Sequence, residues 1–432
     1  MLKTITIDDF KKKYLVAIIN RGKVQFEEVS FAVSKIISEV KQRGDAALFS
    51  FTEKFDGVKL NKDKLAVKKT EIDEAYNKID SKFLEVLKIA KSNIQKYHQA
   101  QFREPWFIDT SKGVSVGQIM KPYRRVGLYI PGGRAPYPST VLMTAIPAKV
   151  AKVKEIILCT PPQKNGKIDP YILVAANEAG IDRIFKIGGA QAIAAMAYGT
   201  KSIPKVEKIV GPGNIYVQAA KQIVSADVRI DLPAGPSEIL IISDEYSKPN
   251  LIAADILSQA EHEPGTFCFL LTTSSKIAEA TIAQLNKIIP KLPKKDYAIE
   301  SLEKNGFFII VKSIDQAIQL ANEIAPEHLE IQIKNPESVL EQIENAGAIF
   351  LGEFSPVPLG DFAAGSNHVL PSGGAARYYS GLTIMDYVKL IDVIKSTKDG
   401  LNELKNCVVN FAQIEGFQAH ANSILERFVA DE

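Results

Sequence analysis

Cysteine is scarce in this 432-residue sequence, which holds only Cys159, Cys268 and Cys407. The three residues stand far apart in apolar surroundings and form no CxxC pair. Three cysteines in this pattern indicate neither a disulfide framework nor a thiolate zinc site. We expect three free thiols.

Long apolar runs and an excess of one charge are also absent. No stretch approaches the roughly 18–20 apolar residues of a membrane span, and "YLVAII" (14–19) is too short for a secretory signal. The net charge is +3, and the short lysine clusters are interleaved with acids. These features argue against membrane and nucleic-acid partners and predict a cytoplasmic protein.

The composition that remains is that of a globular protein, with 46% hydrophobic and 24% charged residues. A single hydrophobic core stops growing at roughly 250–300 residues. We therefore expect at least two domains.

Hydrophobic patterning changes three times along the chain. Up to about Pro122 it is helical, as in "FEEVSFAVSKIISEVKQRG" (26–44). From Val126, short apolar runs such as "VGLYIPGG" and "EIILCTPP" alternate with Gly/Pro loops and helices, and after Ser237 a second series begins with "EILIIS" and "FCFLLT". This alternation predicts two α/β regions with parallel sheets. From Thr383 onward the pattern predicts helix again, including "YVKLIDVIKS".

In open parallel sheets, ligands bind beyond the carboxyl ends of the strands. The glycine-rich loops should gather there. The sequence has no GxGxxG fingerprint, but "PGGRAPYPST" and "IGGAQAIAA" place glycines between a strand and a helix. These glycines fit either a close approach to a cofactor or an ordinary turn. Asn214 in "GPGNIY" likewise fits either a functional role or a helix N-cap.

Histidine is the most informative rare residue, because only five occur and four lie beside acids or loops: His262, His328, His368 and His420. Each alone is more often a surface or core histidine than a ligand. In "NLIAADILSQAEH", helical spacing predicts that Asp255, Gln259 and His262 share a face. Histidine nitrogen combined with amide or carboxylate oxygen suits zinc or another divalent ion, with Asp361 and His420 as candidates to complete the site.

Adjacent Glu327 and His328 in "APEHLE" form a second candidate site. A histidine can remove a proton near neutral pH, and a desolvated carboxylate can activate water. The same residues also fit a helix start, with Pro326 in the first position and Glu327 favoured by the helix dipole, and the two interpretations are compatible.

These segments together resemble the histidinol dehydrogenase family. The matching stretches run in the family's order from Arg43 onward, and they include "VGLYIPGGRAPYPSTVLMTAIPAKVA", "GPGNIYVQAAK", "DLPAGPSEILII", "SQAEHEPG", "APEHLE", "GDFAAGSNHVLP" and "EGFQAHA". The resemblance implies NAD-dependent oxidation of L-histidinol to L-histidine, the last step of histidine biosynthesis, by two hydride transfers through an aldehyde.

The resemblance also implies roles for individual residues. One Zn²⁺ per subunit would be held by Gln259, His262, Asp361 and His420. Glu327 would activate water and His328 would act as the base. Substrate contacts would come from Ser237, His368 and Glu415, together with His328 and the four zinc ligands, and NAD contacts from Tyr129, Gln191 and Asn214.

In the family, the C-terminal tail completes the active site of the other subunit, which implies a homodimer with shared sites. The expected fold is an aldehyde-dehydrogenase-like α/β architecture with two incomplete Rossmann-like domains. The expected boundaries are an N-terminal extension at 1–25, a first domain at 26–129 and 237–381, a second at 130–236, and a helical tail at 382–432.

Three alternatives stay open at this point. A relative of the same superfamily could oxidise another alcohol, such as a sulfonated diol. A zinc hydrolase could use Glu327 to activate metal-bound water, with structural glycine loops and no nicotinamide requirement. A non-catalytic binding protein is disfavoured by the many ionisable residues in strand-end loops.

Overall fold

The computed structural model describes residues 3–132, 135–232, 235 and 237–429, without the side chains of 3 and 23–27. The chain divides into two compact units. The first comprises Met1–Gln101 with Tyr123–Tyr387, and the second Phe102–Pro122 with Val388–Glu432. The predicted junction "LPAGPSE" (232–238) lies partly outside the described residues.

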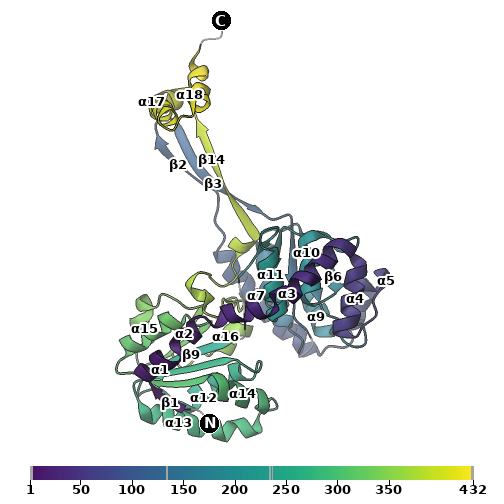
Figure 1. The fold of residues 1–432 in the computed structure, drawn as a ribbon, viewed down its shortest axis with the longest axis vertical. Helices are drawn as coiled ribbons and strands as arrows, with labels where there is room; N and C mark the ends of the chain where they lie inside the picture. Colours follow the sequence, from purple (N-terminus) through teal and green to yellow (C-terminus); the bar gives the residue numbers. More distant parts are fainter. Residues whose placement is uncertain (1–2, 133–134, 233–234, 236, 430–432) are drawn as a thin grey trace. The chain divides into compact units, whose positions relative to one another are not determined.

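A six-stranded parallel sheet forms one half of the first unit, in the order β1-β11-β10-β9-β12-β13 (Figure 1). Its strands are β1 (Lys3–Thr6), β9 (Glu238–Ser243), β10 (Phe267–Thr272), β11 (Gly306–Ile310), β12 (His328–Gln332) and β13 (Ala348–Leu351). The five strands from β9 to β13, taken in chain order, give a 3-2-1-4-5 arrangement, and β1 extends the edge beside β11. The strand order therefore reverses between β9 and β12, which are hydrogen-bonded neighbours.

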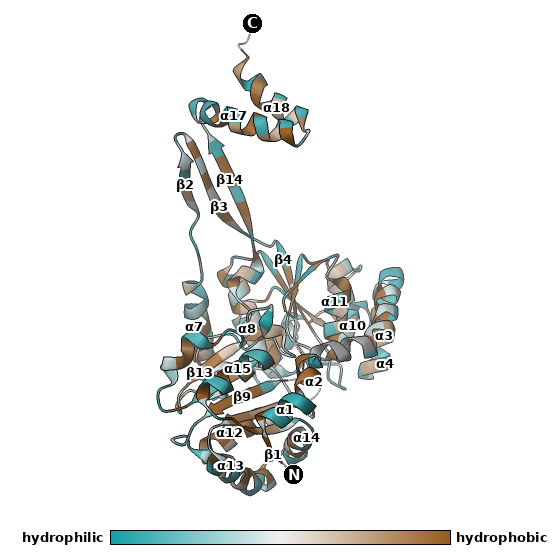
Figure 2. Cartoon of the chain, turned by 60° about the vertical axis from the view of Figure 1, so that its left-hand side comes forward, coloured by the Kyte–Doolittle hydropathy of each residue, from teal (hydrophilic) through white to brown (hydrophobic). Residues whose placement is uncertain are grey.

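Helices cover both faces of this sheet. Along β9, Ile239 and Ile241 face the core beneath one helical layer, whereas Leu240 and Ile242 face the other, as the two-residue period of a strand requires. The first layer holds α12 (Pro249–Ala260), α13 (Ser275–Ile288) and α14 (Lys295–Asn305), and the second α1 (Ile7–Lys13), α2 (Leu15–Ile19) and α15 (Ile314–Ile324). Burial on both faces explains why these strands read as continuous apolar runs, seen as brown around β9 in Figure 2.

A five-stranded parallel sheet forms the other half, in the order β6-β5-β4-β7-β8. Its strands are β4 (Arg125–Tyr129), β5 (Glu155–Thr160), β6 (Arg183–Lys186), β7 (Lys208–Val210) and β8 (Arg229–Ile230). In chain order this is again 3-2-1-4-5, with the reversal between β4 and β7. The predicted α/β fold with two parallel Rossmann-like sheets is confirmed.

The helices beside this sheet come from two parts of the chain. They are α8 (Pro138–Val150), α9 (Pro170–Glu178), α10 (Gly189–Tyr198) and α11 (Ile215–Val224), with α3 (Arg21–Arg43), α4 (Asp45–Asp56), α5 (Lys62–Leu65), α6 (Lys69–Tyr76) and α7 (Ser81–Ala100). Val33, Ile37 and Leu48 of α3 and α4 enter the core under α10 and α11. These helices therefore pack with the five-stranded sheet, although the sequence grouped 26–129 with 237–381; the domain boundaries stay a prediction.

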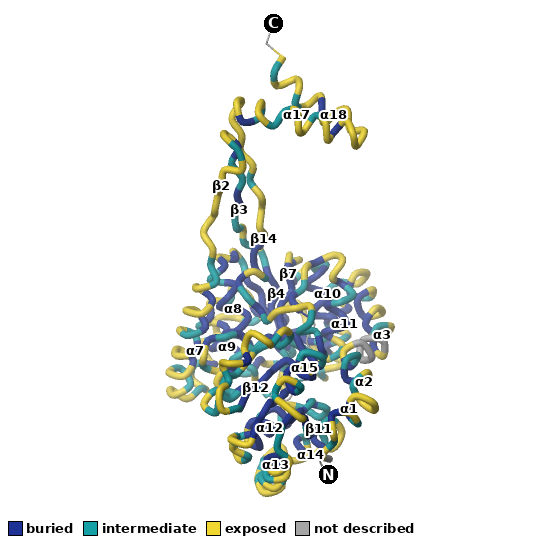
Figure 3. Tube along the Cα trace, turned by 90° about the vertical axis from the view of Figure 1, so that its left-hand side faces the viewer, coloured by how far each residue is buried: buried dark blue, intermediate teal, exposed yellow. Residues whose placement is uncertain are grey.

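The second unit contains an antiparallel sheet with the order β14-β3-β2. Its elements are β2 (Trp106–Ser111), β3 (Val114–Pro122), β14 (Val388–Ser396), α17 (Lys398–Ile414) and α18 (Gln418–Leu425). The prediction of helix for "YVKLIDVIKS" is wrong over 388–396, because this segment pairs with β3 along its whole length. The many β-branched residues of 388–396 favour the extended conformation. Strand β2 of the same unit is largely exposed (Figure 3).

No helix within the described residues is both long and apolar enough to cross a membrane.

Candidate active site

The acid–histidine pair lies where β9 and β12 begin. Helix α15 ends at Ile324, Ala325 adopts a left-handed conformation with φ 51°, and the chain then enters β12 at His328. The prediction of a helix start at Pro326 is therefore wrong. The pair also lies at the amino ends of the strands, opposite the edge at which a parallel sheet usually binds its ligands.

His328 is held in one orientation by the backbone of β9. Its Nδ1 lies 2.9 Å from the carbonyl oxygen of Glu238. A carbonyl only accepts hydrogen bonds, so Nδ1 must carry the proton. The other ring nitrogen, Nε2, has no hydrogen-bond partner among the described residues and lies 3.7 Å from Oδ1 of Asp361. This leaves Nε2 as the reactive nitrogen.

Glu327 is fixed by the same residue of β9. Its Oε2 accepts a hydrogen bond of 3.0 Å from the backbone N–H of Glu238 and lies 3.7 Å from Nδ1 of His328. Burial raises the pKa of Glu327 to about 8. Attraction to His328 opposes this shift, whereas repulsion from Glu238 and Asp361 adds to it. Burial opposes the charge on His328, but Glu327 and Asp361 outweigh it and raise the pKa of His328 to about 9. Such perturbed groups in contact are typical of catalytic sites.

Gln259 and Asp361 are two buried members of the predicted zinc-ligand set, and they lie on different helices. Gln259, on α12, is 1% exposed, and neither its Oε1 nor its Nε2 has a hydrogen-bond partner among the described residues. A buried amide without partners is unfavourable, which indicates that a ligand completes the site. Asp361 lies on α16 (Val357–Phe362). Burial acts to raise the pKa of Asp361, but His328, His368 and His262 outweigh it and lower the pKa, so its carboxylate is charged.

His262 does not share the helical face that its spacing suggested. Helix α12 ends at Ala260, and His262 follows it with its N–H hydrogen-bonded to the carbonyl of Gln259. Asp255 accepts its hydrogen bond from Gln332. His262 is accessible to solvent. Desolvation by the surrounding protein nevertheless lowers the pKa of His262, although the charge of Asp361 opposes this shift. A neutral imidazole is the form that binds a metal.

Two further predicted site residues, the zinc ligand His420 and the substrate contact Glu415, belong to the second unit. Glu415 follows α17, His420 lies on α18, and both are exposed. Within the described residues, no three His, Cys, Asp or Glu side chains are grouped to hold a metal ion. Of the predicted histidine and carboxylate ligands, His262 and Asp361 lie in the first unit and His420 lies in the second.

His368 and Ser237 flank the acid–histidine pair. His368 donates from Nδ1 to the carbonyl of Asp361 at 2.8 Å, and its Nε2 lies 3.1 Å from the Thr140 hydroxyl. Both of its nitrogens thus have protein partners, and the ring holds the Asp361 segment in place. Ser237 immediately precedes β9 and is half-buried.

The predicted NAD residues lie at the carboxyl edge of the five-stranded sheet. Tyr129 ends β4, and its hydroxyl accepts a hydrogen bond from the N–H of Gly189. Gln191 is buried in the first turn of α10. Asn214 follows β7 and accepts hydrogen bonds from Tyr216 and Val217, so its N-cap role is confirmed. Tyr129 and Asn214 thus flank the point where the strand order reverses.

A buried ion pair shapes the loop after β7. Gly211 has φ 126°, and a Cβ there would meet the Tyr129 carbonyl oxygen at 2.1 Å, so only glycine fits. The Asp231 carboxylate accepts a hydrogen bond from the N–H of Gly211. Lys221 donates to the carbonyl oxygen of Gly211 and forms an ion pair with Asp231. Both polar backbone groups of Gly211 are therefore fixed by one ion pair.

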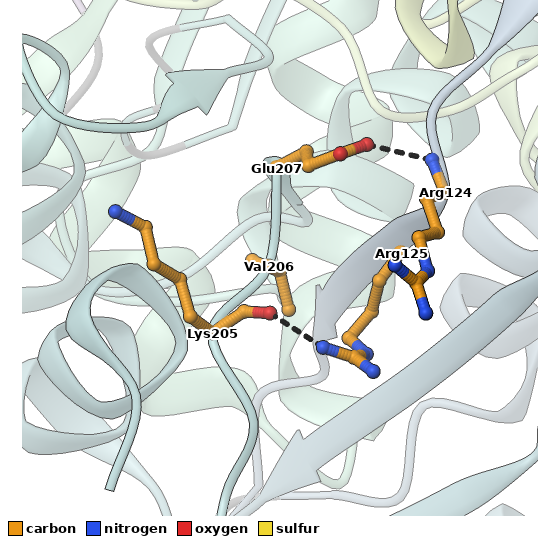
Figure 4. A pocket seen from close by; sticks show the side chains of 5 residues that line it. All are labelled: Arg124, Arg125, Lys205, Val206 and Glu207. Atoms are coloured by element: carbon orange, nitrogen blue, oxygen red, sulfur yellow. Dashed lines mark hydrogen bonds between the residues drawn. The ribbon is translucent and has the colours of Figure 1, made fainter.

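A surface pocket lies at the amino edge of the five-stranded sheet, where β4 and β7 begin. Its lining consists of Arg124, Arg125, Lys205, Val206 and Glu207 (Figure 4). The N–H of Arg124 donates to Glu207, and the guanidinium of Arg125 donates to the Lys205 carbonyl and to Glu155. None of the predicted site residues lines this pocket.

Two Rossmann-like sheets, one carrying a buried acid–histidine pair and the other strand-end glycine loops, define an α/β enzyme. The sequence model of the family described as histidinol dehydrogenase matches residues 19–428. Histidinol dehydrogenase from Listeria innocua is 51% identical over 93% of both chains, and that from Bacillus thuringiensis is 48% identical over 99% of this chain and 100% of that one. The crystal structure of histidinol dehydrogenase from Elizabethkingia anophelis has a TM-score of 0.90, with 41% identity over 92% of both chains. The chain belongs to the histidinol dehydrogenase family, a family of oxidoreductases.

Two functional candidates escaped the sequence analysis. Glu238 and Arg21 are both buried next to the acid–histidine pair and form an ion pair. The only local signal was a charged residue at the head of the apolar strand "EILIIS".

Proposed function

We propose that this protein is a zinc-containing, NAD-dependent enzyme that oxidises L-histidinol to L-histidine, the last step of histidine biosynthesis. The observation that carries the proposal is the fixed orientation of His328, whose Nε2 lies 3.7 Å from Oδ1 of Asp361 and has no hydrogen-bond partner in the described part of the chain. The buried amide of Gln259, which also has no partner there, adds to it. Membership of the histidinol dehydrogenase family supports the choice of substrate.

The reaction needs two oxidations with a hydration between them. In its neutral form, which a pKa of about 9 makes the minor form below that pH, His328 would accept the proton of the alcohol at Nε2 in the first oxidation, and that of the aldehyde hydrate in the second. Glu327 would hold and deprotonate the water that adds to the aldehyde. Its burial suits this role, because a carboxylate removed from water is a stronger base.

The residues present fit a zinc ion. Gln259, His262 and Asp361 of one subunit, with His420 of a second, offer two nitrogens and two oxygens, a set that zinc accepts. The unpartnered, buried Gln259 amide is the structural support for this assignment. When bound, the ion would supply a Lewis acid that anchors the substrate's imidazole and amine. Ser237, His368 and Glu415 remain proposed substrate contacts.

NAD is the proposed oxidant, held near Tyr129, Gln191 and Asn214. All three lie at or beyond the carboxyl ends of the strands, and Tyr129 and Asn214 flank the point of order reversal at which sheets of this strand order bind dinucleotides. The loops there contain glycines that pack closely on other backbone, as Gly211 does on Tyr129.

A homodimer with shared sites is the proposed assembly. The second unit exposes many large apolar side chains, among them Trp106, Phe107, Ile108, Ile394, Phe411, Ile414 and Phe417. So much exposed apolar surface indicates a protein partner. A second copy that covers this surface would receive Glu415 and His420 at its site.

The decisive test counts NADH molecules formed per L-histidinol consumed by zinc-loaded protein, with and without a chelator. We expect two NADH, abolished by chelation. A single NADH would indicate an enzyme that stops at the aldehyde or prefers another alcohol, such as a sulfonated diol. Chelator-sensitive hydrolysis without NADH would support the hydrolase instead.

Shared sites are tested by mixing two inactive variants, His328→Asn and His420→Asn, after subunit exchange. Each mixed dimer would hold one intact site, so activity should return to at most about one quarter of the wild-type value. Mixtures that stay inactive despite measured exchange would refute sharing.

A further inference from the structure

Glu238 connects the two proposed catalytic residues through its backbone. Its N–H donates to Oε2 of Glu327 at 3.0 Å, and its carbonyl oxygen accepts from Nδ1 of His328 at 2.9 Å. A shift of this one residue would therefore move both side chains together.

The side chain of Glu238 has a separate set of partners. Arg21 makes two parallel hydrogen bonds to it, from Nε to Oε1 at 2.5 Å and from Nη2 to Oε2 at 2.6 Å. The N–H of Gly373 adds a third, at 3.0 Å. Glu238 is 1% exposed and Arg21 8%, so water does not compete with these bonds.

Arg21 is itself anchored, as a positioning role requires. Its Nη1 donates to the carbonyl oxygens of Ile18 at 2.7 Å and Ile324 at 3.1 Å. Ile324 ends α15, two residues before Pro326 and three before Glu327. The guanidinium thus contacts the segments that lead into both β9 and β12.

We propose that Arg21 and Glu238 are positioning residues, which set the orientation of Glu327 and His328 through the backbone of Glu238. Neither residue need touch the substrate. The two-pronged geometry of the guanidinium fixes both the distance and the plane of the Glu238 carboxylate, which a single ammonium group does not do. The kinetic consequence rests on the proposed dehydrogenase function, whereas the effect on the His328 ring does not.

Arg21→Lys is the sharpest variant, because it keeps the buried charge but loses the paired hydrogen bonds. We expect kcat to fall by about 10- to 100-fold, the usual cost of misplacing a catalytic group. KM for L-histidinol and zinc content should stay within about twofold of wild type, because the proposed ligands are untouched. Glu238→Gln keeps the backbone but leaves the buried Arg21 without its counter-charge, and it should show the same split.

Lys11→Met provides a matched control. Lys11 also joins the N-terminal segment to α15 by an ion pair, at 2.6 Å from Glu323, but it lies on the surface. We expect this variant to retain wild-type kcat. Equal loss in both variants would indicate a general effect of loosening the N-terminal segment and would overturn the proposal.

A spectroscopic measurement separates this proposal from the proposed function. The chain has five histidines, so ¹⁵N-histidine labelling gives few imidazole signals, and His328→Asn identifies the one from His328. In wild type, its Nδ1–H should be protected from solvent exchange, whatever the charge of the ring. Arg21→Lys should shift this signal or speed its exchange, while Lys11→Met should not.

The outcomes are distinct. A moved signal with reduced kcat supports the positioning role. An unmoved signal with wild-type kcat in a folded Arg21→Lys protein overturns it and leaves the ion pair a purely structural one. A wild-type protein that fails to oxidise L-histidinol refutes the proposed function, yet a moved signal would still support the positioning role.

Discussion

The six-stranded and five-stranded sheets of the first unit share one strand order but carry their proposed sites at opposite edges. In both sheets the strand order reverses at one point, between β9 and β12 in one and between β4 and β7 in the other. Tyr129 is the last residue of β4 and Asn214 follows the carboxyl end of β7, as the topology predicts. Glu327 and His328 instead lie at the amino end of β12. Strand order therefore selects the pair of strands, while the loops decide which edge is used.

The sheets also differ in how a buried ion pair holds each site. Lys221 and Asp231 are 10 residues apart and fix the single loop residue Gly211. Arg21 and Glu238 are 217 residues apart and hold two side chains through one backbone. One ion pair is thus local and acts on the proposed cofactor loop, whereas the other is long-range and acts on the proposed catalytic pair.

His328→Asn tests the amino edge most severely. Asparagine can still donate to the Glu238 carbonyl but has no basic nitrogen, so turnover should fall by roughly 10²- to 10⁴-fold. Steady-state kinetics with metal analysis would check this, since zinc content should not change. Near-normal turnover would remove His328 from the base role and leave the amino edge without its catalytic group.

His262→Asn separates metal binding from proton transfer at the same edge. Loss of a direct ligand should weaken zinc binding by more than the roughly 10- to 100-fold cost of losing an outer contact, with a matching loss of turnover. Equilibrium dialysis followed by metal analysis gives the affinity, and Glu261→Gln, one residue away, serves as the control. Full zinc retention in His262→Asn would contradict the ligand assignment.

The double variant Lys221→Met/Asp231→Leu should affect the carboxyl edge alone. Replacing both members of a buried ion pair by apolar residues often preserves stability, but here the hydrogen bonds to Gly211 are lost. We expect KM for NAD to rise about 10-fold, which corresponds to losing one or two hydrogen bonds, with kcat nearly unchanged. If kcat falls instead and KM for NAD does not change, the Lys221–Asp231 pair does not act on cofactor binding alone.

Asp56→Asn should produce the smallest effect, on stability beside the five-stranded sheet. Asp56 is the last residue of α4, and its Oδ2 is buried with no hydrogen-bond partner in the described part of the chain. Burial raises its pKa to about 6 from an ordinary value of 3.8. The folded state therefore binds the proton more tightly, and this stabilisation is present below pH 3.8 and lost as the pH rises through 6.

Asparagine cannot ionise, so the variant should gain roughly 1–2 kcal/mol at pH 8, after allowance for solvent screening. The gain should vanish near pH 4. Denaturant unfolding of both proteins at the two pH values measures the difference. A gain of equal size at both values would place its origin outside the ionisation of Asp56.

The sequence predicted features whose cause is local. "EILIIS" and "FCFLLT" coincide with β9 and β10, because strands buried on both faces must be apolar throughout. Asn214 was recognisable as an N-cap by its residue type and its place before a helix. The adjacent acid and histidine were visible as a pair, and the family resemblance supplied their proposed roles.

What the sequence could not predict depends on distant partners. Segment 388–396 forms a strand because β3, more than 250 residues earlier, pairs with it. The edge occupied by Glu327 depends on the left-handed turn at Ala325, an uncommon conformation for alanine. Arg21 carries no motif, and its link to Glu238 exists only in the folded chain.

The position of Arg21 near the start of the sequence has a consequence for folding. Strand β1 pairs with β11, where Lys3 lies opposite Phe307, and Arg21 meets Glu238. During synthesis these early segments must wait for partners made hundreds of residues later. Contacts of such long sequence separation form slowly and late. The orientation of the acid–histidine pair therefore depends on contacts that a nascent chain cannot make until Glu238 and His328 have been synthesised.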